Sequence, residues 1–382
     1  MGEVQELQLT ITTQEAMDAN SHEQTSDSNQ SHVPHSGKYT RWLRVFIYAT
    51  FVIFGQATAT LLGRLYYDKG GKSKWMATLV QLAGFPLLLP YYFSILATKK
   101  NRTNRTIIRS KRPSFSTLAS IYIALGIFIA GDCYLYSVGL LYLPVSTFSL
   151  ICASQLAFNA IFSFFLNSQK FTPYIINSLV LLTISSVLLV FQSSSEENHK
   201  SSKAKYAIGF ICTLCASAGY GLVLSSTQFF IQKVIKRVTF SVIIDLLVFE
   251  SIVATLAILV GLFASQEWKD LNEEMNLFEL GKVSYVMTLA WTAIVWQVFA
   301  IGSVGLIVEV SSLFSNVISV LGLPVVPVLS IFFFQEKMDG LKATAMVLAI
   351  WGFISYAYQN YLDSYDSKTQ NRDSNEETRA SE

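Results

Sequence analysis

The stretch GIFIAGDCYLYSVGLLYLPVSTFSLICASQLAFNAIFSFF, residues 126–165, is almost wholly apolar, yet it contains Asp132, Gln155 and Asn159. Apolar runs that approach ~20 residues are long enough for an α-helix to cross a bilayer. Strands that cross a membrane are shorter and alternate between apolar and polar residues. The stretch therefore predicts two consecutive transmembrane helices that bury one carboxylate and two amides.

The composition of the whole chain agrees with this prediction. Of its 382 residues, 52% are hydrophobic and only 14% are charged, whereas about a quarter of the residues in a soluble domain are charged. We therefore expect an all-α, polytopic membrane protein embedded in a lipid bilayer. Ten apolar runs predict ten transmembrane helices, centred on residues 42–63, 75–97, 116–140, 143–166, 173–191, 206–229, 240–263, 284–305, 310–333 and 341–359.

The ten spans fall into two groups of five, separated by the hydrophilic residues 192–205. Because five is an odd number, the second group enters the membrane from the opposite side, and any structural repeat is inverted. VSTFSLICASQL (145–156) and VSSLFSNVISVL (310–321) are similar and fall at matching positions, so the fourth and ninth spans are expected counterparts. The predicted organisation is two inverted five-helix repeats, at 41–191 and 206–361, with polar, disordered cytosolic tails at 1–40 and 362–382.

The charges of the loops predict the orientation in the membrane. Residues 98–113 contain seven Lys or Arg and no acid, whereas residues 264–280 contain five acids and one Lys. Basic loops are enriched on the cytosolic side. We therefore expect both termini to lie in the cytosol.

Polar side chains form a stripe on each of the two counterpart spans. With the periodicity of an α-helix, one side of the fourth span carries Gln155 and Asn159, and one side of the ninth carries Asn316 and three serines. In lipid, such stripes must face protein or water. They predict either a shared substrate cavity near the membrane midplane or hydrogen bonds that hold the helices together.

Two acids lie deep inside apolar spans. Asp132 is ~24 Å from one end of the third span and shares a helix face with Tyr136. Glu250 is near the centre of the seventh span. A carboxyl group in a low dielectric favours its neutral form, which suits a group that gains and loses a proton. Asp132 and Glu250 are therefore candidates for proton coupling, and Asp132 and Tyr136 for substrate binding. The alternative is that each acid is a permanently hydrogen-bonded structural group.

The missing cations restrict the substrate. Lys and Arg are absent from residues 113–169, 238–268 and 283–336, which disfavours a phosphorylated substrate and favours a neutral or cationic one. Gln56 in the first span and Trp296 in the eighth add an amide and an aromatic face, and amides and aromatic rings bind adenine-like rings by hydrogen bonding and stacking. Trp296 also fits a plain packing role. The four His lie outside the spans, so no metal site and no cofactor are expected.

Three segments resemble the plant purine permeases, a branch of the drug/metabolite transporter superfamily. They are GDCYLYSVGLLYLPVSTFSLICASQLAFNAIFSFFLNSQKFTPYIINSLVLLTISSVLL (131–189), VSSLFSNVISVLGLPVVPVLSIFFFQEK (310–337) and AIWGFISYAYQNYLD (349–363). The resemblance runs from about Trp42 to Asp363. Superfamily members carry a Glu-Lys pair after the ninth span, which matches Glu336 and Lys337, whereas the first repeat has Gln169 and Lys170.

This resemblance implies ten helices in two inverted repeats and proton-coupled uptake of adenine, cytokinins and related nitrogen heterocycles, including alkaloids. Uptake implies the plasma membrane as the host membrane, with protons and a small heterocycle as partners and no nucleic acid. The cavity is expected between spans one, three, four, eight and nine. A membrane receptor or scaffold is the alternative, and a membrane enzyme is the least favoured class because the deep parts of the spans lack His, Lys and Arg.

Overall fold

The computed structural model describes residues 36–94, 114–168, 200–236, 240–336 and 338–352, together with parts of 172–185 and isolated positions up to residue 362. Every regular element in these ranges is a helix. Residues Trp42–Glu382 form one compact unit, and the contacts below belong to its described part. Of Met1–Arg41, the structure describes only the first turns of helix α2.

Among the described residues, eight helical segments are long and apolar enough to cross a membrane, which confirms an all-helical, multi-pass membrane protein. They coincide with eight of the ten expected spans. The fifth (173–191) lies mostly outside the described residues, the tenth is visible as the shorter helix Gly340–Gly352, and the ten-helix count and the repeat stay predictions. The eight segments are Thr40–Asp68, Lys74–Ser94, Ser116–Tyr142, Val145–Asn167, Lys203–Ile235, Ile243–Ala264, Gly281–Glu309 and Ser312–Phe334.

Three of these spans are interrupted part of the way across. The second consists of α3 (Lys74–Leu82) and the 3-10 turn η1 (Phe85–Leu88), the fourth of α6 (Val145–Cys152) and α7 (Gln155–Asn167), and the ninth of α13 (Ser312–Gly322) and α14 (Val325–Phe334). The other spans are α2 (Ser36–Asp68), α5 (Phe115–Tyr142), α9 (Lys200–Phe229) with the π-helical turn η2 (Phe230–Ile235), α10 (Phe240–Ala264) and α12 (Gly281–Glu309).

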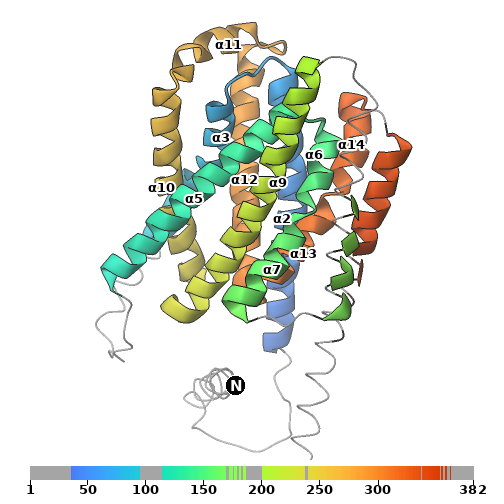
Figure 1. Cartoon of the computed structure of the whole chain (residues 1–382). Helices are drawn as coiled ribbons and strands as arrows, with labels where there is room; N and C mark the ends of the chain where they lie inside the picture. The colour runs from blue at the N-terminus through green and yellow to red at the C-terminus, as the bar shows by residue number, and fades with distance from the viewer. Residues whose placement is uncertain are drawn as a thin grey trace, which may run out of the picture. The chain divides into compact units, whose positions relative to one another are not determined.

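The fourth and ninth spans cross each other in opposite directions. Helix α6 packs against α14, and α7 packs against α13, so that the beginning of each span contacts the end of the other. Helix α9 contacts α5, α6, α7 and α13, and Figure 1 shows α5 running obliquely beside it. The matching interruptions and the antiparallel crossing support the prediction that these spans are counterparts.

Helix α2 buries one stripe and turns the other side outward. Val45, Tyr48, Val52, Gln56 and Ala59 recur every three or four residues and are all buried, which is the spacing of one helix face. Large apolar side chains lie on the opposite side, where lipid solvates them in a membrane. These outward side chains include Trp42, Phe46 and Phe54.

Glycines allow α12 to lie directly against the buried stripe of α2. A Cβ atom on Gly302 would lie 2.7 Å from the backbone oxygen of Tyr48, and one on Gly305 would lie 2.8 Å from the ring of Tyr48. Small residues that let backbones approach closely are a common basis of helix association in membranes. Other residues of both helices line the cavity described below.

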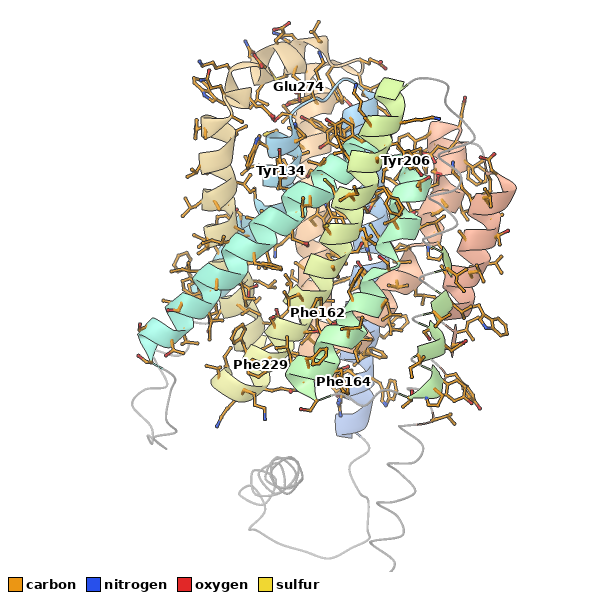
Figure 2. The ribbon with its side chains drawn as sticks, in the orientation of Figure 1. Tyr134, Phe162, Phe164, Tyr206, Phe229 and Glu274 are labelled. Carbon is orange, nitrogen blue, oxygen red and sulfur yellow. The ribbon has the colours of Figure 1, made fainter. Side chains whose placement is uncertain are left out.

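The loop between α10 and α12 is bound to one end of the bundle. Its short helix α11 (Leu271–Leu277) carries Glu274, which Figure 2 labels at that end. The Glu274 carboxylate accepts hydrogen bonds from the Tyr66 hydroxyl, from the Tyr285 hydroxyl at 3.1 Å and from the backbone N–H of Ser73 at 3.1 Å. The loop therefore joins α2, the start of α3 and α12 through one buried carboxylate.

Gly302→Ala tests the close contact between α2 and α12. The added methyl group collides with backbone, and overpacking of this kind costs about 1–3 kcal/mol, so we expect the thermal unfolding temperature of the purified protein to fall. Gly131→Ala is the matched control, because, apart from its chain neighbours and the backbone of its own helix, no atom of the described structure lies within 4 Å of a Cβ at Gly131. Equal unfolding temperatures for the two variants would contradict the contact.

Candidate functional site

A cavity of about 190 Å³ lies among the helices of the Trp42–Glu382 unit. One water molecule needs only ~10–15 Å³ of such space, so the cavity has room for a small organic molecule. Its walls come from α2, α3, α5, α6, α7, α9, α10 and α12, and from Leu323 at the interruption of the ninth span. The second, sixth and seventh spans thus join the five that the sequence predicts.

The cavity brings together most of the candidate residues. Among the residues that line it are Gln56, Asp132, Tyr136, Gln155, Trp296 and Glu250. They come from five different helices and lie up to 240 positions apart in the sequence. This placement agrees with a common site, while their roles in binding and proton coupling stay predictions.

Asn159 and Asn316 do not line the cavity. Asn159 is fully buried, its Nδ2 donates to the Ser312 backbone oxygen at 3.2 Å, and its Oδ1 accepts from the Ser225 hydroxyl at 2.7 Å. Asn316 is also fully buried, and its Nδ2 donates to the Gln155 backbone oxygen at 3.0 Å. In this conformation both amides join helices, which is the alternative that the polar stripes left open.

The two buried acids have an oxygen without a hydrogen-bond partner among the described residues. Asp132 is 7% exposed and Glu250 is 5% exposed, and the unpartnered atoms are Asp132 Oδ1 and Glu250 Oε1. Asp132 Oδ1 lies directly over Gly219 of α9, where a Cβ would come within 2.2 Å of it. A buried polar atom without a hydrogen-bond partner lowers the stability of the fold, so such an atom calls for another explanation, such as a functional role. Both oxygens are therefore available to a proton or to a bound molecule.

Aromatic rings form much of the remaining wall. Trp296, in the middle of α12, meets Phe299 edge to face with ring centroids 5.3 Å apart, and Tyr136 meets Phe148 in the same way at 5.9 Å. The described lining contains no Lys, Arg or His. Acids and amides without a cation, set between aromatic rings, suit a flat, neutral or cationic ring better than an anion.

Two residues that the sequence ranks below the main candidates also lie at or next to the cavity. Gln297 lines the cavity, is 4% exposed and has no partner for its Nε2 among the described residues. Ser319 lies behind the wall and bonds two of the lining amides. Both sit on apolar helices beside a stronger candidate, Trp296 or Asn316, and only packing shows which neighbour faces the cavity.

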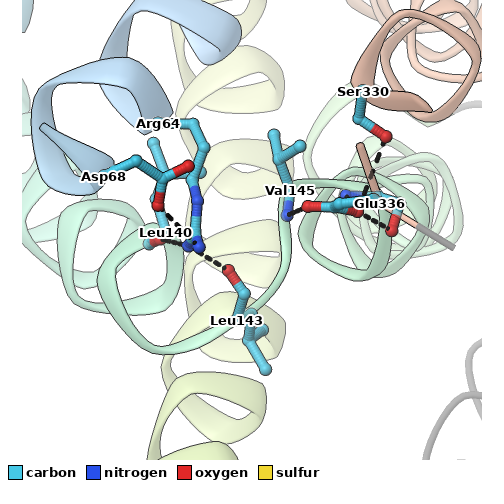
Figure 3. A network of polar contacts seen from close by, with 8 residues as sticks. Arg64, Asp68, Leu140, Leu143, Val145, Ser330 and Glu336 are labelled. Carbon is cyan, nitrogen blue, oxygen red and sulfur yellow. Dashed lines mark hydrogen bonds and ion pairs between the residues drawn. The ribbon is translucent and has the colours of Figure 1, made fainter. Parts of the chain in front are cut away.

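A charged clamp closes around the turn between the third and fourth spans (Figure 3). On one side, Arg64 Nη1 donates to the backbone oxygens of Leu140 at 3.1 Å and Leu143 at 2.8 Å, and Arg64 Nη2 pairs with Asp68 at 2.8 Å. A cation at the carbonyl end of a helix is favoured by the helix dipole. The sequence does not identify Arg64 as a candidate, because the first span is expected to end at residue 63. In the structure α2 continues about one turn further.

Glu336, which follows α14, completes the clamp from the C-terminal half of the chain. Its carboxylate accepts from the backbone N–H of Val145 at 2.8 Å and of Ser146 at 3.2 Å, and also from the Ser146 hydroxyl. Helix α6 is preceded by Pro144, which has no side-chain acceptor. Glu336 therefore supplies the N-terminal cap that α6 lacks, and Figure 3 shows it opposite Arg64 across the turn.

The beginning of the ninth span is capped without a charge. Ser311 accepts from the Phe314 backbone N–H at 3.1 Å, and Gln228 Oε1 accepts from the Ser312 backbone N–H at 2.7 Å. Near the same end of the bundle, Arg44 of α2 pairs with Glu309 of α12 at 2.7 Å. The two counterpart spans therefore begin in different ways, one capped by a carboxylate and one by an amide.

Glu336→Gln tests the clamp. The amide loses the negative charge and one acceptor, and loss of an N-cap costs about 0.5–2 kcal/mol, so we expect a lower unfolding temperature of the purified protein. Glu273→Gln, on the exposed side of α11, is the control and should leave this temperature unchanged. If both variants unfold at the wild-type temperature, the carboxylate does not stabilise α6.

The fold and the cavity define the class of this protein as an integral, multi-pass membrane transporter. Residues 43–366 match the family model described as purine nucleobase transmembrane transport. The chain belongs to this family, and it is a transporter and not an enzyme.

Relatives with similar sequences support the assignment. The chain is 59% identical to Probable purine permease 10 of Arabidopsis thaliana, over 89% of this chain and 86% of the relative. It is 57% identical to Purine permease 21 of the same plant, over 90% and 87%. A solved crystal structure matches with a TM-score of 0.50 at 16% identity, over 83% of this chain and 96% of its own, and that likeness concerns the fold alone.

Proposed function

We propose that this chain takes up purine bases and related nitrogen heterocycles, such as adenine, cytokinins and alkaloids, by alternating access coupled to protons. Family membership and the names of the relatives support purine transport. The observation that carries the proposal for this chain is the cavity, which combines two unpartnered buried carboxylates with amides and aromatic rings.

The substrate contacts follow from the chemistry of the wall. Trp296 and Tyr136 offer ring faces, Gln56 and Gln155 offer amides, and Asp132 offers an acceptor for a ring N–H or an amino group. Asn159 and Asn316 would reach a substrate only in a different conformation, because other helices now hold both amides. The absence of a cation from the described lining excludes a strong attraction for phosphorylated compounds.

The driving force is the proton gradient, and no cofactor takes part. Asp132 and Glu250 both lie on the cavity with an oxygen free to bind a proton. A carboxyl group that is neutral when buried and charged when water reaches it changes its proton occupancy as the cavity opens to either side. Asp132 lies on α5 and Glu250 on α10, so one acid can contact the substrate while the other carries the proton.

The membrane orientation follows from the loop charges. With both termini in the cytosol, the end that carries α11 and the clamp faces away from the cytosol. The host membrane is the plasma membrane, where a proton gradient directed inward drives uptake.

Asp132→Asn and Glu250→Gln test this function. We expect Asp132→Asn to lower the initial rate of labelled adenine uptake at least about tenfold, the loss of one charge-assisted hydrogen bond. In the variant that replaces the proton carrier, low external pH should no longer stimulate adenine uptake, and a protonophore should no longer inhibit it. Asp270→Asn, at an exposed position of the α10–α12 loop, is the control.

These measurements separate the two parts of the proposal. Wild-type cells that take up no more adenine than empty cells contradict purine transport by this chain. Wild-type uptake that does not respond to pH or protonophore contradicts proton coupling. Unchanged rate and pH response in Asp132→Asn remove Asp132 from the mechanism.

A further inference from the structure

A chain of hydrogen bonds joins two amides on the cavity wall through one serine. Gln155 Nε2 donates to Ser319 Oγ at 3.0 Å, and Ser319 Oγ donates to Gln56 Oε1 at 2.6 Å. The three side chains come from α7, α13 and α2 and are 2%, 1% and 7% exposed, respectively. Gln56 and Gln155 line the cavity, whereas Ser319 lies behind them.

The serine hydroxyl sets the two amides in opposite orientations. It gives its one proton to the oxygen of Gln56, and its own oxygen accepts an N–H from Gln155. In each amide, the group that is not bonded to the serine remains available to a molecule in the cavity. In this structure Gln56 is left with N–H donors and Gln155 with its carbonyl oxygen. Exchanging the two orientations would still leave one donor and one acceptor.

The surroundings hold this arrangement in place. Asn316, one turn before Ser319 on α13, donates to the backbone oxygen of Gln155 at 3.0 Å, so α13 binds this residue twice. Gln155 is the first residue of α7, directly after the interruption at Ala153 and Ser154. Within the described structure, Gln155 Oε1 has one hydrogen-bond partner, the Tyr136 hydroxyl, and the distance of 3.5 Å is long for a hydrogen bond. That oxygen remains able to accept from a bound molecule.

We propose that Ser319 is a positioning residue for substrate specificity, which sets Gln56 and Gln155 to present one donor and one acceptor to the cavity. This inference rests on the proposed function and names the recognised feature of the substrate. The matching molecule is a flat heterocycle with an acceptor ring nitrogen next to an exocyclic amino N–H, as on the amino edge of adenine. A ring that lacks the donor leaves the Gln155 oxygen unpaired in a buried site, which disfavours its binding.

The test measures binding and not transport. Purified full-length protein is titrated with adenine, with unsubstituted purine, which lacks the amino group, and with N6,N6-dimethyladenine, which keeps the ring nitrogens but has no amino N–H. Apparent affinities come from the ligand-induced rise of the unfolding temperature. We expect wild type to prefer adenine over both analogues at least about tenfold. One analogue is smaller than adenine and the other is larger, so a steady trend of affinity with ligand size does not produce this order.

Ser319→Ala removes the hydroxyl and should reduce this preference to about threefold or less, because each amide then turns independently. Ser319→Cys, with a weakly hydrogen-bonding thiol, should show the same fall and serves where Ser319→Ala does not fold. Ser319→Thr keeps a hydroxyl and should restore the preference. Ser315→Ala is the matched control: it lies on the same helix with 1% exposure, and its hydroxyl bonds the Ser303 backbone oxygen at 2.9 Å and no amide.

A wild type without preference, an unchanged preference in both Ser319→Ala and Ser319→Cys, or an equal loss in Ser315→Ala would overturn the role of Ser319. These results differ from a failure of the proposed function. If the preference follows the Ser319 hydroxyl but cells accumulate no adenine, transport is wrong and the specificity role stands. If adenine is accumulated and the Ser319 variants bind like wild type, transport stands and the specificity role of Ser319 is wrong.

Discussion

The structure depends on how this chain satisfies its backbone groups where membrane helices are interrupted. In the hydrocarbon region no water bonds a free N–H or C=O group, so irregular backbone is tolerated only where protein or a cavity covers it. The second, fourth and ninth spans break at residues 83–84, 153–154 and 323–324. A cavity-lining residue stands beside each break, namely Leu82, Cys152 with Gln155, and Leu323. The interruptions and the cavity therefore form one feature, and Gln155, whose backbone oxygen accepts a hydrogen bond from Asn316, belongs to both.

The helices and the buried acids could be predicted from the sequence because their signals are local. Run length sets the spans, and a carboxylate in the middle of an apolar run must face the inside. Asp132, Glu250 and the polar stripes of the fourth and ninth spans needed no tertiary information. The clear cases among the site residues were those with one polar group on an otherwise apolar helix.

The direction of each polar side chain could not be predicted in the same way. A helical wheel places Gln155 and Asn159 on one arc, but the arc is wide enough to face both the cavity and α9. In the structure Gln155 lines the cavity and Asn159 bonds Ser225 of α9. The walls from α3, α9 and α10 were missed for a related reason, because their contributions include apolar residues such as Val80, Val223 and Leu247, which resemble any other packing position.

The two ends of the counterpart spans differ in a way that bears on movement. At the start of the fourth span, the carboxylate of Glu336 and the guanidinium of Arg64, from opposite halves of the chain, hold the same turn. At the start of the ninth span, Ser311 and the neutral Gln228 do the capping. Water weakens hydrogen bonds from charged groups more than those of a neutral cap, because each ion regains its hydration when it leaves the turn. The two ends therefore need not open with equal ease, although the spans cross each other in a symmetric manner.

The same helices that bear the amides also carry the breaks, which ties substrate recognition to the change of access. Gln155 is the first residue of α7, Ser319 lies near the end of α13, and Gln56 of α2 is bonded to Ser319. A molecule that bonds both amides holds these three helices at one relative position. A ligand shifts a conformational equilibrium only through contacts that differ between the two states. If α7 and α13 move relative to α2 during transport, the pair of opposite amides is present in one state and absent in the other, so recognition and release follow from one rearrangement.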